Sequence, residues 1–369
     1  MDEKVLQEVN VKLELLADSF QKVLYEDDET FLENMKSKNL AGDDINRYKH
    51  WEWTQGVGLF GYWKLFTFTK EEKYLETLKA YYDKQLEIGL PHMNVNTVTP
   101  LLAMSYLAEY TGEAQYMRVC EENAKWIMEH FPRTVEQGFQ HMTSDSENKG
   151  ELWDDTLFMT VLFLANMGRI LQRREYLEEA EYQFMLHVKY LTDRDTGLWY
   201  HGWTFEERHN FAKALWGRGN CWITAAIPIF LEIDTQCPPS VSRFLKETLK
   251  RQVESLKEYQ DPTGMWHTLV DDAGSYVETS ATCGFAFGIL QAIQMHVVDE
   301  SYYEIAKKAL HSVLKYIRED GVVDQVSYGT PMGRESKDFY KQIEIKSMPY
   351  GQALAMLLLI QSRIMAENM

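Results

Sequence analysis

About twelve stretches of this chain repeat apolar side chains every three or four residues, the spacing that places them on one face of an α-helix. They span 4–24, 54–68, 71–89, 96–110, 114–130, 155–171, 174–192, 206–233 with a break near Gly219, 240–258, 280–297, 301–317 and 350–366. Extended segments are expected only in the loops. Because no Pro/Gly/Ser-rich linker or change of composition interrupts the 369 residues, we expect one domain, residues 1–369.

Twelve successive helices favour an all-α fold of six helical hairpins closed into a ring, an (α/α)6 barrel. A short motif recurs where one predicted helix ends and the next begins: Thr69–Leu75 is echoed by Thr111–Met117. An open array of hairpins would need a polar capping repeat at each end, and neither end of the chain resembles one. The last segment is apolar on all sides from Tyr350 to Met356, so we expect it to be covered by the first.

The net charge of −18 argues against nucleic acid as a partner, because nucleic acid requires a basic surface. An anionic small ligand would need a local cationic patch. The first ten residues lack the basic and apolar regions of a secretory signal, and no apolar run approaches the length of a membrane span. We therefore expect a cytoplasmic protein without a membrane partner, and the oligomeric state stays open.

The sequence holds no motif for a metal or nucleotide cofactor. The ten histidines show no HxxxH or HxH pairing, and neither GxxxxGK[ST] nor GxGxxG occurs. A GxSxG nucleophile motif is also absent. We therefore expect no cofactor and no metal. Carboxylate acid–base chemistry beside stacking aromatic rings remains, and this combination is typical of enzymes that act on sugars.

Aromatic and polar side chains gather where predicted helices begin, and in a ring of hairpins these junctions converge on one mouth. Each has a structural explanation when taken alone, since tryptophans commonly pack under loops and Asn94 or Asn96 could cap helix 96–110. Their shared position favours a common site. The candidates are Trp53, Asn96, His141, Trp153, Asp155, His201, Arg218 and Trp222.

Asp154 and Asp155 follow Trp153 and precede a strongly apolar helix. By local pattern alone, either aspartate is most simply a helix N-cap, its carboxylate accepting a backbone N–H. The alternative is that one aspartate caps the helix and the other faces a substrate. A general acid needs a raised pKa, which burial beside Trp153 would supply and the helix N-terminus would oppose.

Four motifs carry a family resemblance: W-D-D-T-L-F-M from Trp153, Y-H-G-W from Tyr200, W-G-R-G-N-C-W from Trp216 and E-T-S-A-T from Glu278. Together, and in this order between Trp51 and Gln352, they resemble the unsaturated rhamnogalacturonyl hydrolases, glycoside hydrolase family 105. The unsaturated glucuronyl hydrolases are relatives of that family. The resemblance implies the (α/α)6 barrel independently of the helix count.

The resemblance also implies the reaction and the site. Such enzymes hydrate the C4=C5 double bond of the unsaturated uronate left by a polysaccharide lyase, after which the glycosidic bond breaks. Asp155 matches the general acid/base and Trp153 a wall of the site. The pocket-lining positions match His141, His201, Arg218 and Trp222, and Trp53 matches an aromatic before Q-G-V. The expected substrate is the unsaturated galacturonyl-rhamnose disaccharide from pectin, with the Arg218 fork binding its carboxylate.

The sequence differs from the family's pattern at two positions, and these differences affect the expected substrate more than the expected reaction. Asn96 stands where some relatives carry an aspartate, and Thr204 where relatives carry an aspartate after H-G-W. The alternatives are an unsaturated glucuronyl hydrolase, or an inverting glycosidase that uses Asp155 with Glu278 across a cleft of about 6.5–9.5 Å. A non-enzymatic carbohydrate-binding toroid is a further alternative, in which Asp155 is only a cap.

Overall fold

The computed structural model describes residues 3–368, and six of its helices form an inner ring around the core. Each packs against the next, and α14 packs against both α11 and α3, which closes the ring. Apolar residues are present on all sides of these helices because each is covered on all sides. The inner helices are α3 (Trp53–Thr69), α5 (Val95–Thr111), α7 (Leu162–Leu171), α9 (Gly217–Ile233), α11 (Thr279–Gln294) and α14 (Pro349–Asn368).

Six amphipathic helices form the outer ring, each with one buried face and one face in solvent. This alternation of inner and outer helices along the chain confirms the all-α fold of six hairpins. The outer helices are α1 (Glu3–Val23), α4 (Glu72–Ile88), α6 (Ala114–His130), α8 (Arg174–Leu191), α10 (Pro239–Glu258) and α12 (Tyr303–Tyr316).

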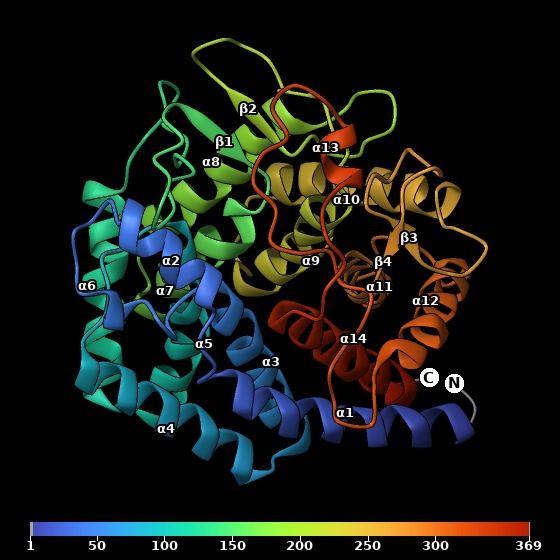
Figure 1. The fold of residues 1–369 in the computed structure, drawn as a ribbon, viewed down its shortest axis with the longest axis horizontal. Helices are drawn as coiled ribbons and strands as arrows, with labels where there is room; N and C mark the ends of the chain where they lie inside the picture. Colours follow the sequence, from blue (N-terminus) through green and yellow to red (C-terminus); the bar gives the residue numbers. More distant parts are fainter. Residues whose placement is uncertain (1–2, 369) are drawn as a thin grey trace.

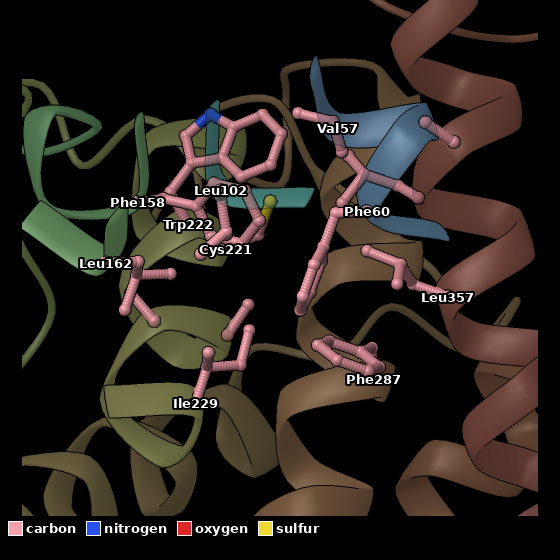
Figure 2. Packing of buried hydrophobic residues seen from close by; sticks show 14 of the residues in the cluster. Val57, Phe60, Leu102, Phe158, Leu162, Cys221, Trp222, Ile229, Phe287 and Leu357 are labelled. Carbon is pink, nitrogen blue, oxygen red and sulfur yellow. The ribbon is translucent and has the colours of Figure 1, made fainter. Parts of the chain in front are cut away.

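The first helix covers the last, as the apolar end of the sequence predicts (Figure 1). Gln352 Nε2 on α14 donates a hydrogen bond to Ser19 Oγ on α1 at 2.9 Å, and Arg363 Nη1 donates to Asn10 Oδ1 at 2.6 Å. Most of the core is one cluster that runs from Val9 to Met365, and a second, small cluster consists of Ala214, Trp216, Leu269 and Tyr340. Figure 2 shows side chains of the inner helices meeting in the larger cluster, among them Phe60 and Phe287. The single-domain interpretation stays a prediction.

Between residues 3 and 368, short strands occur only in the connections, as expected, and they lie before inner helices. β1 (Glu151–Trp153) pairs antiparallel with β2 (Gly202–Thr204), which places Trp153 opposite Gly202. β3 (Trp266–His267) pairs with β4 (Val277–Glu278) directly ahead of α11. β1, β2 and the short helix α13 (Asp338–Lys341) gather at one end of the molecule (Figure 1). These connections therefore build the mouth of the barrel.

The structure corrects the predicted elements in two places. The predicted helix 206–233 begins only at Gly217, because Arg208, Phe211 and Lys213 have φ angles of 61°, 50° and 52° that no α-helix accepts. Helix α2 (Glu29–Lys38) was not predicted, because Met35 is its only buried residue and it therefore lacks an apolar stripe.

Three further short elements were not separated by the sequence pattern: the 3-10 turns η1 (Ile45–Arg47) and η3 (Glu300–Tyr302), and the π-helical turn η2 (Leu157–Val161) ahead of α7. Within residues 3–368, no helix is both long enough and apolar enough to cross a membrane.

Candidate active site

A cavity of about 630 Å³ opens where the connections meet the N-terminal ends of inner helices. Two tryptophans, Trp53 and Trp222, form part of its wall, with their rings 6.1 Å apart and perpendicular. Trp53 also stacks on Tyr350 at 4.7 Å, which fixes its ring. The candidates that the structure brings together around this cavity are Trp53, Asn96, His141, Trp153, Asp155, Arg218 and Trp222.

Asp155 follows strand β1, and its carboxyl faces the cavity with 19% of the side chain exposed. Burial raises the pKa of Asp155 to about 7, against the opposing effects of the positive charge of Arg218 and of nearby backbone N–H groups. Asp155 therefore carries a proton through a large part of the neutral range. Burial therefore raises the pKa of Asp155 more than the nearby helix N-terminus lowers it.

Asp154 is fully buried and packs against α9 at Gly219, where a β-carbon would lie 2.2 Å from Asp154 Oδ2. Burial, followed by the proximity of Asp155, raises the pKa of Asp154 well above its ordinary value. Neither aspartate caps a helix, because η2 begins after Thr156 without a side-chain capping bond. The capping interpretation of Asp154 is therefore wrong. The local sequence pattern did not reveal that a glycine on another helix makes room for this carboxyl.

His141 stacks on Trp153 with ring centroids 4.2 Å apart and planes 6° from parallel. Its Nδ1 lies 2.8 Å from Thr156 Oγ1 and 3.4 Å from Asp155 Oδ1. Because burial lowers the pKa of His141 to about 3, the imidazole is neutral at physiological pH. The contact with Asp155 is therefore a polar contact with a neutral ring and does not hold Asp155 in its ionised form.

Arg218 lines the cavity from the first turn of α9, between the rings of Trp216 and Tyr350 at 4.7 and 4.6 Å. Its four terminal N–H groups are already used. Nη1 donates to Ser280 Oγ at 3.4 Å and to the carbonyl of Ser327 at 2.7 Å. Nη2 donates to the carbonyl of Tyr328 and to Thr330 Oγ1, both at 3.0 Å. In this structure these groups are committed to Ser280 and to residues 327–330, and the binding of a substrate carboxylate by the Arg218 fork stays a prediction.

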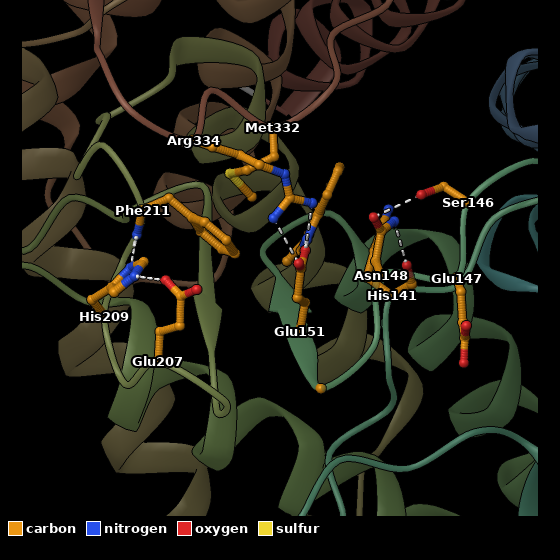
Figure 3. Close-up of polar contacts among 12 residues, drawn as sticks. His141, Ser146, Glu147, Asn148, Glu151, Glu207, His209, Phe211, Met332 and Arg334 are labelled. Atoms are coloured by element: carbon orange, nitrogen blue, oxygen red, sulfur yellow. Dashed lines mark hydrogen bonds and ion pairs between the residues drawn. The ribbon is translucent and has the colours of Figure 1, made fainter.

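Through these bonds Arg218 holds a long connection over the mouth, residues 327–340, which we call the strap. The strap supplies Tyr328, Met332 and Arg334 to the cavity wall. Arg334 pairs with Glu151 on β1, with N–O distances of 2.8 and 3.3 Å (Figure 3). Glu151 also accepts a bond from Trp153 Nε1 at 2.9 Å. The strap is thus connected to the wall that carries Trp153. Sequence reasoning missed Arg334 because no periodic pattern marks the strap.

His201 lies behind the wall and does not line the cavity. It is 2% exposed, with its ring 4.3 Å from that of Trp216 and 5.1 Å from that of Trp153. Its Nδ1 lies 2.6 Å from the hydroxyl of Tyr340 on the strap. Burial holds its pKa well below the ordinary histidine value. The expectation that His201 faces the pocket is corrected: it supports Trp153 and the strap.

Asn96 faces the cavity from the first turn of α5 while its neighbour Asn94 caps the helix. Asn94 Oδ1 accepts bonds from the backbone N–H groups of Asn96 and Thr97 at 2.9 and 3.2 Å. The capping explanation therefore holds for Asn94 and leaves the side chain of Asn96 free of that role.

Glu278, the second carboxylate of the inverting-glycosidase alternative, is fully buried and caps α11. Its oxygens accept bonds from the backbone N–H groups of Ser280 and Ala281 at 2.7 and 2.6 Å. It does not line the cavity. The pairing of Asp155 with Glu278 across a cleft is therefore contradicted, because the carboxyl of Glu278 is committed to a helix.

Two further parts of the cavity wall were not predicted from the sequence. One is the face of α2 that presents Thr30, Asn34 and Lys38, spaced four residues apart. The other is the loop 143–148, in which Asn148 Nδ2 donates to the carbonyl of His141 at 2.8 Å (Figure 3). The only sequence signal for α2 was Asp28, whose side chain caps its first turn.

Among the described residues, one trio has the ligand types and spacing to hold a metal ion: Glu181, Asp234 and Cys237. It does not belong to the cavity. The guanidinium of Arg174 already contacts Glu181 and, at 3.6 Å, Asp234. A bound cation would have to displace this positive charge.

Residues 28–366 match the family described as Glycosyl Hydrolase Family 88. The chain belongs to glycosyl hydrolase family 88. The prediction that the chain is a glycoside hydrolase is confirmed. The match begins after α1 and includes every residue of the cavity wall named above.

Similar proteins of known name or structure support this family membership. The chain is 32% identical over 312 residues to the unsaturated rhamnogalacturonyl hydrolase YesR of Bacillus subtilis (strain 168), covering 84% of this chain and 88% of that protein. A structure from Klebsiella pneumoniae subsp. pneumoniae MGH 78578, described as a possible member of family 105, is 41% identical with a TM-score of 0.88, covering 99% of this chain and 94% of that one.

The unsaturated glucuronyl hydrolase of Bacillus sp. GL1 shares the fold, with a TM-score of 0.71 at 16% identity over 97% of this chain and 96% of that one. The predicted six-hairpin barrel is thereby confirmed for this family 88 chain.

Proposed function

We propose that this family 88 hydrolase releases the unsaturated uronic acid from lyase-generated oligosaccharides by hydrating the C4=C5 double bond. Asp155 is the general acid/base. The observation that carries the proposal is the state of this carboxyl: burial raises its pKa to about 7, and it faces a cavity walled by Trp53, Trp153 and Trp222. A group that must first give and then take a proton works best with a pKa near the working pH.

The double bond is part of an enol ether, because C5 carries the ring oxygen. Asp155 gives its proton to C4, and the positive charge that develops is shared between C5 and the ring oxygen. Water adds to C5 and loses a proton to the Asp155 carboxylate, which restores the acid. The new hydroxyl at C5 forms a hemiketal. When the hemiketal opens, the bond between C5 and the ring oxygen breaks, C5 becomes a ketone, and the ring oxygen becomes a hydroxyl on C1. C1 then releases the leaving sugar, which takes the proton of that hydroxyl, and becomes an aldehyde. The proposed reaction needs no oxidant and no cofactor.

The charges around the cavity suit an anionic substrate. Lys38, Arg218 and Arg334 line it, whereas its acidic lining residues are Asp145 and Asp155, whose raised pKa of about 7 reduces its negative charge at neutral pH. This local excess of positive charge lies in a chain of net charge −18. A focused positive potential within an acidic protein attracts an anion that the protein as a whole repels.

The leaving sugar lies against α2 and the loop 143–148, the outer walls of the cavity. Thr30, Asn34 and Lys38 present hydroxyl, amide and ammonium groups there, all exposed to solvent at the mouth. Lys38 forms no ion pair with another described residue. Polar groups of this kind bind sugar hydroxyls. Rhamnose as the leaving sugar is supported by the name of the Bacillus subtilis relative.

The test follows the ultraviolet band of the unsaturated uronate with two lyase-generated disaccharides, unsaturated galacturonyl-rhamnose and an unsaturated glucuronide. We expect the wild type to remove the band faster with the first, and Asp155→Asn to be slower by about 10³-fold or more. Asp320→Asn, at a surface carboxylate paired with Arg318 away from the cavity, is the matched control. Persistence of the band with the wild type on both substrates would refute the proposal.

The main rival reaction was ordinary inverting hydrolysis. It predicts turnover of saturated nitrophenyl glycosides, whereas hydration of a double bond predicts none. The cap formed by Glu278 removes the carboxylate that this rival needed. A cytoplasmic location stays a prediction.

A further inference from the structure

Helix α2 presents a row of polar side chains to the mouth of the cavity. Thr30, Asn34 and Lys38 line the cavity, and all three are exposed to solvent. Because residues four apart lie on the same face of a helix, they form a continuous stripe, which we call the α2 stripe. A helix rises about 1.5 Å per residue, so the stripe runs for about 12 Å along the helix axis. This length exceeds one sugar ring and suits two sugars in succession.

The position of α2 is fixed although Met35 is its only buried residue. Asn39, which ends the helix, donates from its side-chain Nδ2 to the carbonyl of Asp43 at 2.7 Å. The backbone N–H of the next residue, Leu40, donates to the carbonyl of Ser144 at 3.4 Å. This last contact ties the end of α2 to the neighbouring part of the cavity wall. The α2 stripe is therefore held at a defined place at the mouth.

Lys38 carries a charge that the fold does not use. Its ammonium is not paired with the acidic side chain of any described residue. A cation in the last turn of a helix stabilises that helix through its dipole, but Lys36 supplies the same effect without lining the cavity. The leaving rhamnose is uncharged, so the hydroxyl of Thr30 and the amide of Asn34 suit it without a cation. The ammonium of Lys38 therefore suits an anionic group further along the substrate.

The reactive uronate is not the anion that Lys38 meets. That sugar must place its C4 at Asp155 and its ring beside Trp153, whose side chains are only 19% and 7% exposed. Lys38, in contrast, is exposed to solvent at the mouth. Asp145, on the loop 143–148, is the acidic lining residue of the outer walls and disfavours an anion on its own side. The α2 side of the mouth is therefore the side that accepts a second negative charge.

We propose that the α2 stripe is a subsite for a leaving part longer than one sugar, in which Lys38 binds the carboxylate of a second uronate. A lyase acting on a polymer that alternates galacturonate and rhamnose also releases unsaturated tetrasaccharides. In these the second carboxylate lies on the sugar that follows the leaving rhamnose. The enzyme then prefers the tetrasaccharide to the disaccharide. The inference rests on the proposed function, because the reactive sugar at Asp155 sets the order in which the other sugars leave the cavity.

The test compares kcat/KM for the unsaturated tetrasaccharide with that for the unsaturated galacturonyl-rhamnose disaccharide. In the wild type we expect a ratio of about three to five in favour of the tetrasaccharide, the effect of one solvent-exposed ion pair. Lys38→Met should bring this ratio close to one, and Lys38→Arg should keep it. Lys36→Met is the matched control, because it removes the same charge from the last turn of α2 outside the cavity. Its ratio should equal that of the wild type.

Ionic strength provides a second readout. The distance over which exposed charges interact falls from about 10 Å at 0.1 M salt to about 3 Å at 1 M. The ratio of kcat/KM values should therefore fall toward one at 1 M salt in the wild type and change little in Lys38→Met. Both substrates contain the same unsaturated uronate, so the effect of salt on that sugar cancels in the ratio.

Binding on an Asp155→Asn background separates the subsite from the reaction, with the Kd of each saccharide measured by calorimetry. We expect the same preference for the tetrasaccharide, and its loss in Lys38→Met. If the wild type turned over neither substrate while this preference in Kd held, the proposed reaction would fail and the subsite would stand. If the wild type showed no preference for the tetrasaccharide, or if Lys38→Met and Lys36→Met gave the same ratio, the subsite would be overturned.

Discussion

The carboxyl of Asp154 lies so close to Gly219 that a β-carbon on that glycine would sit 2.2 Å from Asp154 Oδ2. This contact joins the Asp154-Asp155 pair to the first turn of α9, which also carries Arg218. The position of the proposed catalytic acid therefore depends on the absence of a side chain on a helix more than sixty residues away in sequence.

Gly219→Ala should destabilise the protein by about 1–3 kcal/mol, because a methyl group overpacks a site that has no room for it. Denaturant unfolding measures this. Gly329→Ala is the control for stability, since nothing lies within 4 Å of a β-carbon at that position. Equal midpoints for both variants would show that the contact between Asp154 and Gly219 is not tight.

The activity should fall as the pH rises through about 7, because Asp155 must hold a proton to begin the reaction and its pKa is raised to that value by burial. The protonated form is the active one, so the limb at high pH is the one that Asp155 sets. Initial rates of loss of the unsaturated band between pH 5 and 9 give kcat/KM. A flat profile across pH 6–8 would contradict this assignment.

Glu278→Ala should lower stability and leave the chemistry intact. The substitution strands two buried backbone N–H groups at the start of α11, which costs about 1–3 kcal/mol. At a temperature where the variant remains folded, we expect its kcat within about threefold of the wild type. A loss of kcat of a hundredfold or more, without unfolding, would restore Glu278 as a catalytic carboxylate.

Arg334→Ala should raise KM more than it lowers kcat. Arg334 is the strap residue that pairs with Glu151, and Glu151 in turn binds the indole N–H of Trp153. Without it, the side chain of Glu151, 8% exposed, loses its cation and the wall at Trp153 loosens. Steady-state kinetics with Arg318→Ala as control tests this, since Arg318 pairs with Asp320 in solvent. An equal response of the two variants would mean that the strap plays no part in binding.

The barrel could be predicted because helical periodicity is a local property. A buried inner helix such as α14 is apolar on all sides and an outer helix such as α10 on one side, so their alternation is written along the chain. The two errors in the predicted helices also have local causes. Segment 206–216 has apolar residues at plausible spacings but bends through left-handed turns, and α2 has too little buried surface to leave a pattern.

For the site, the sequence by itself determined which residue types were present and in what order: the aspartate pair after Trp153, Arg218 at the start of a helix, and the aromatic residues at the junctions. The tertiary structure decided their roles. Burial depends on what other segments contribute, and it alone makes Asp155 a neutral-range acid and His141 a neutral ring. Other roles depend on hydrogen bonds between segments distant in sequence, so only the folded chain shows that Arg218 holds the strap and that His201 contacts Tyr340.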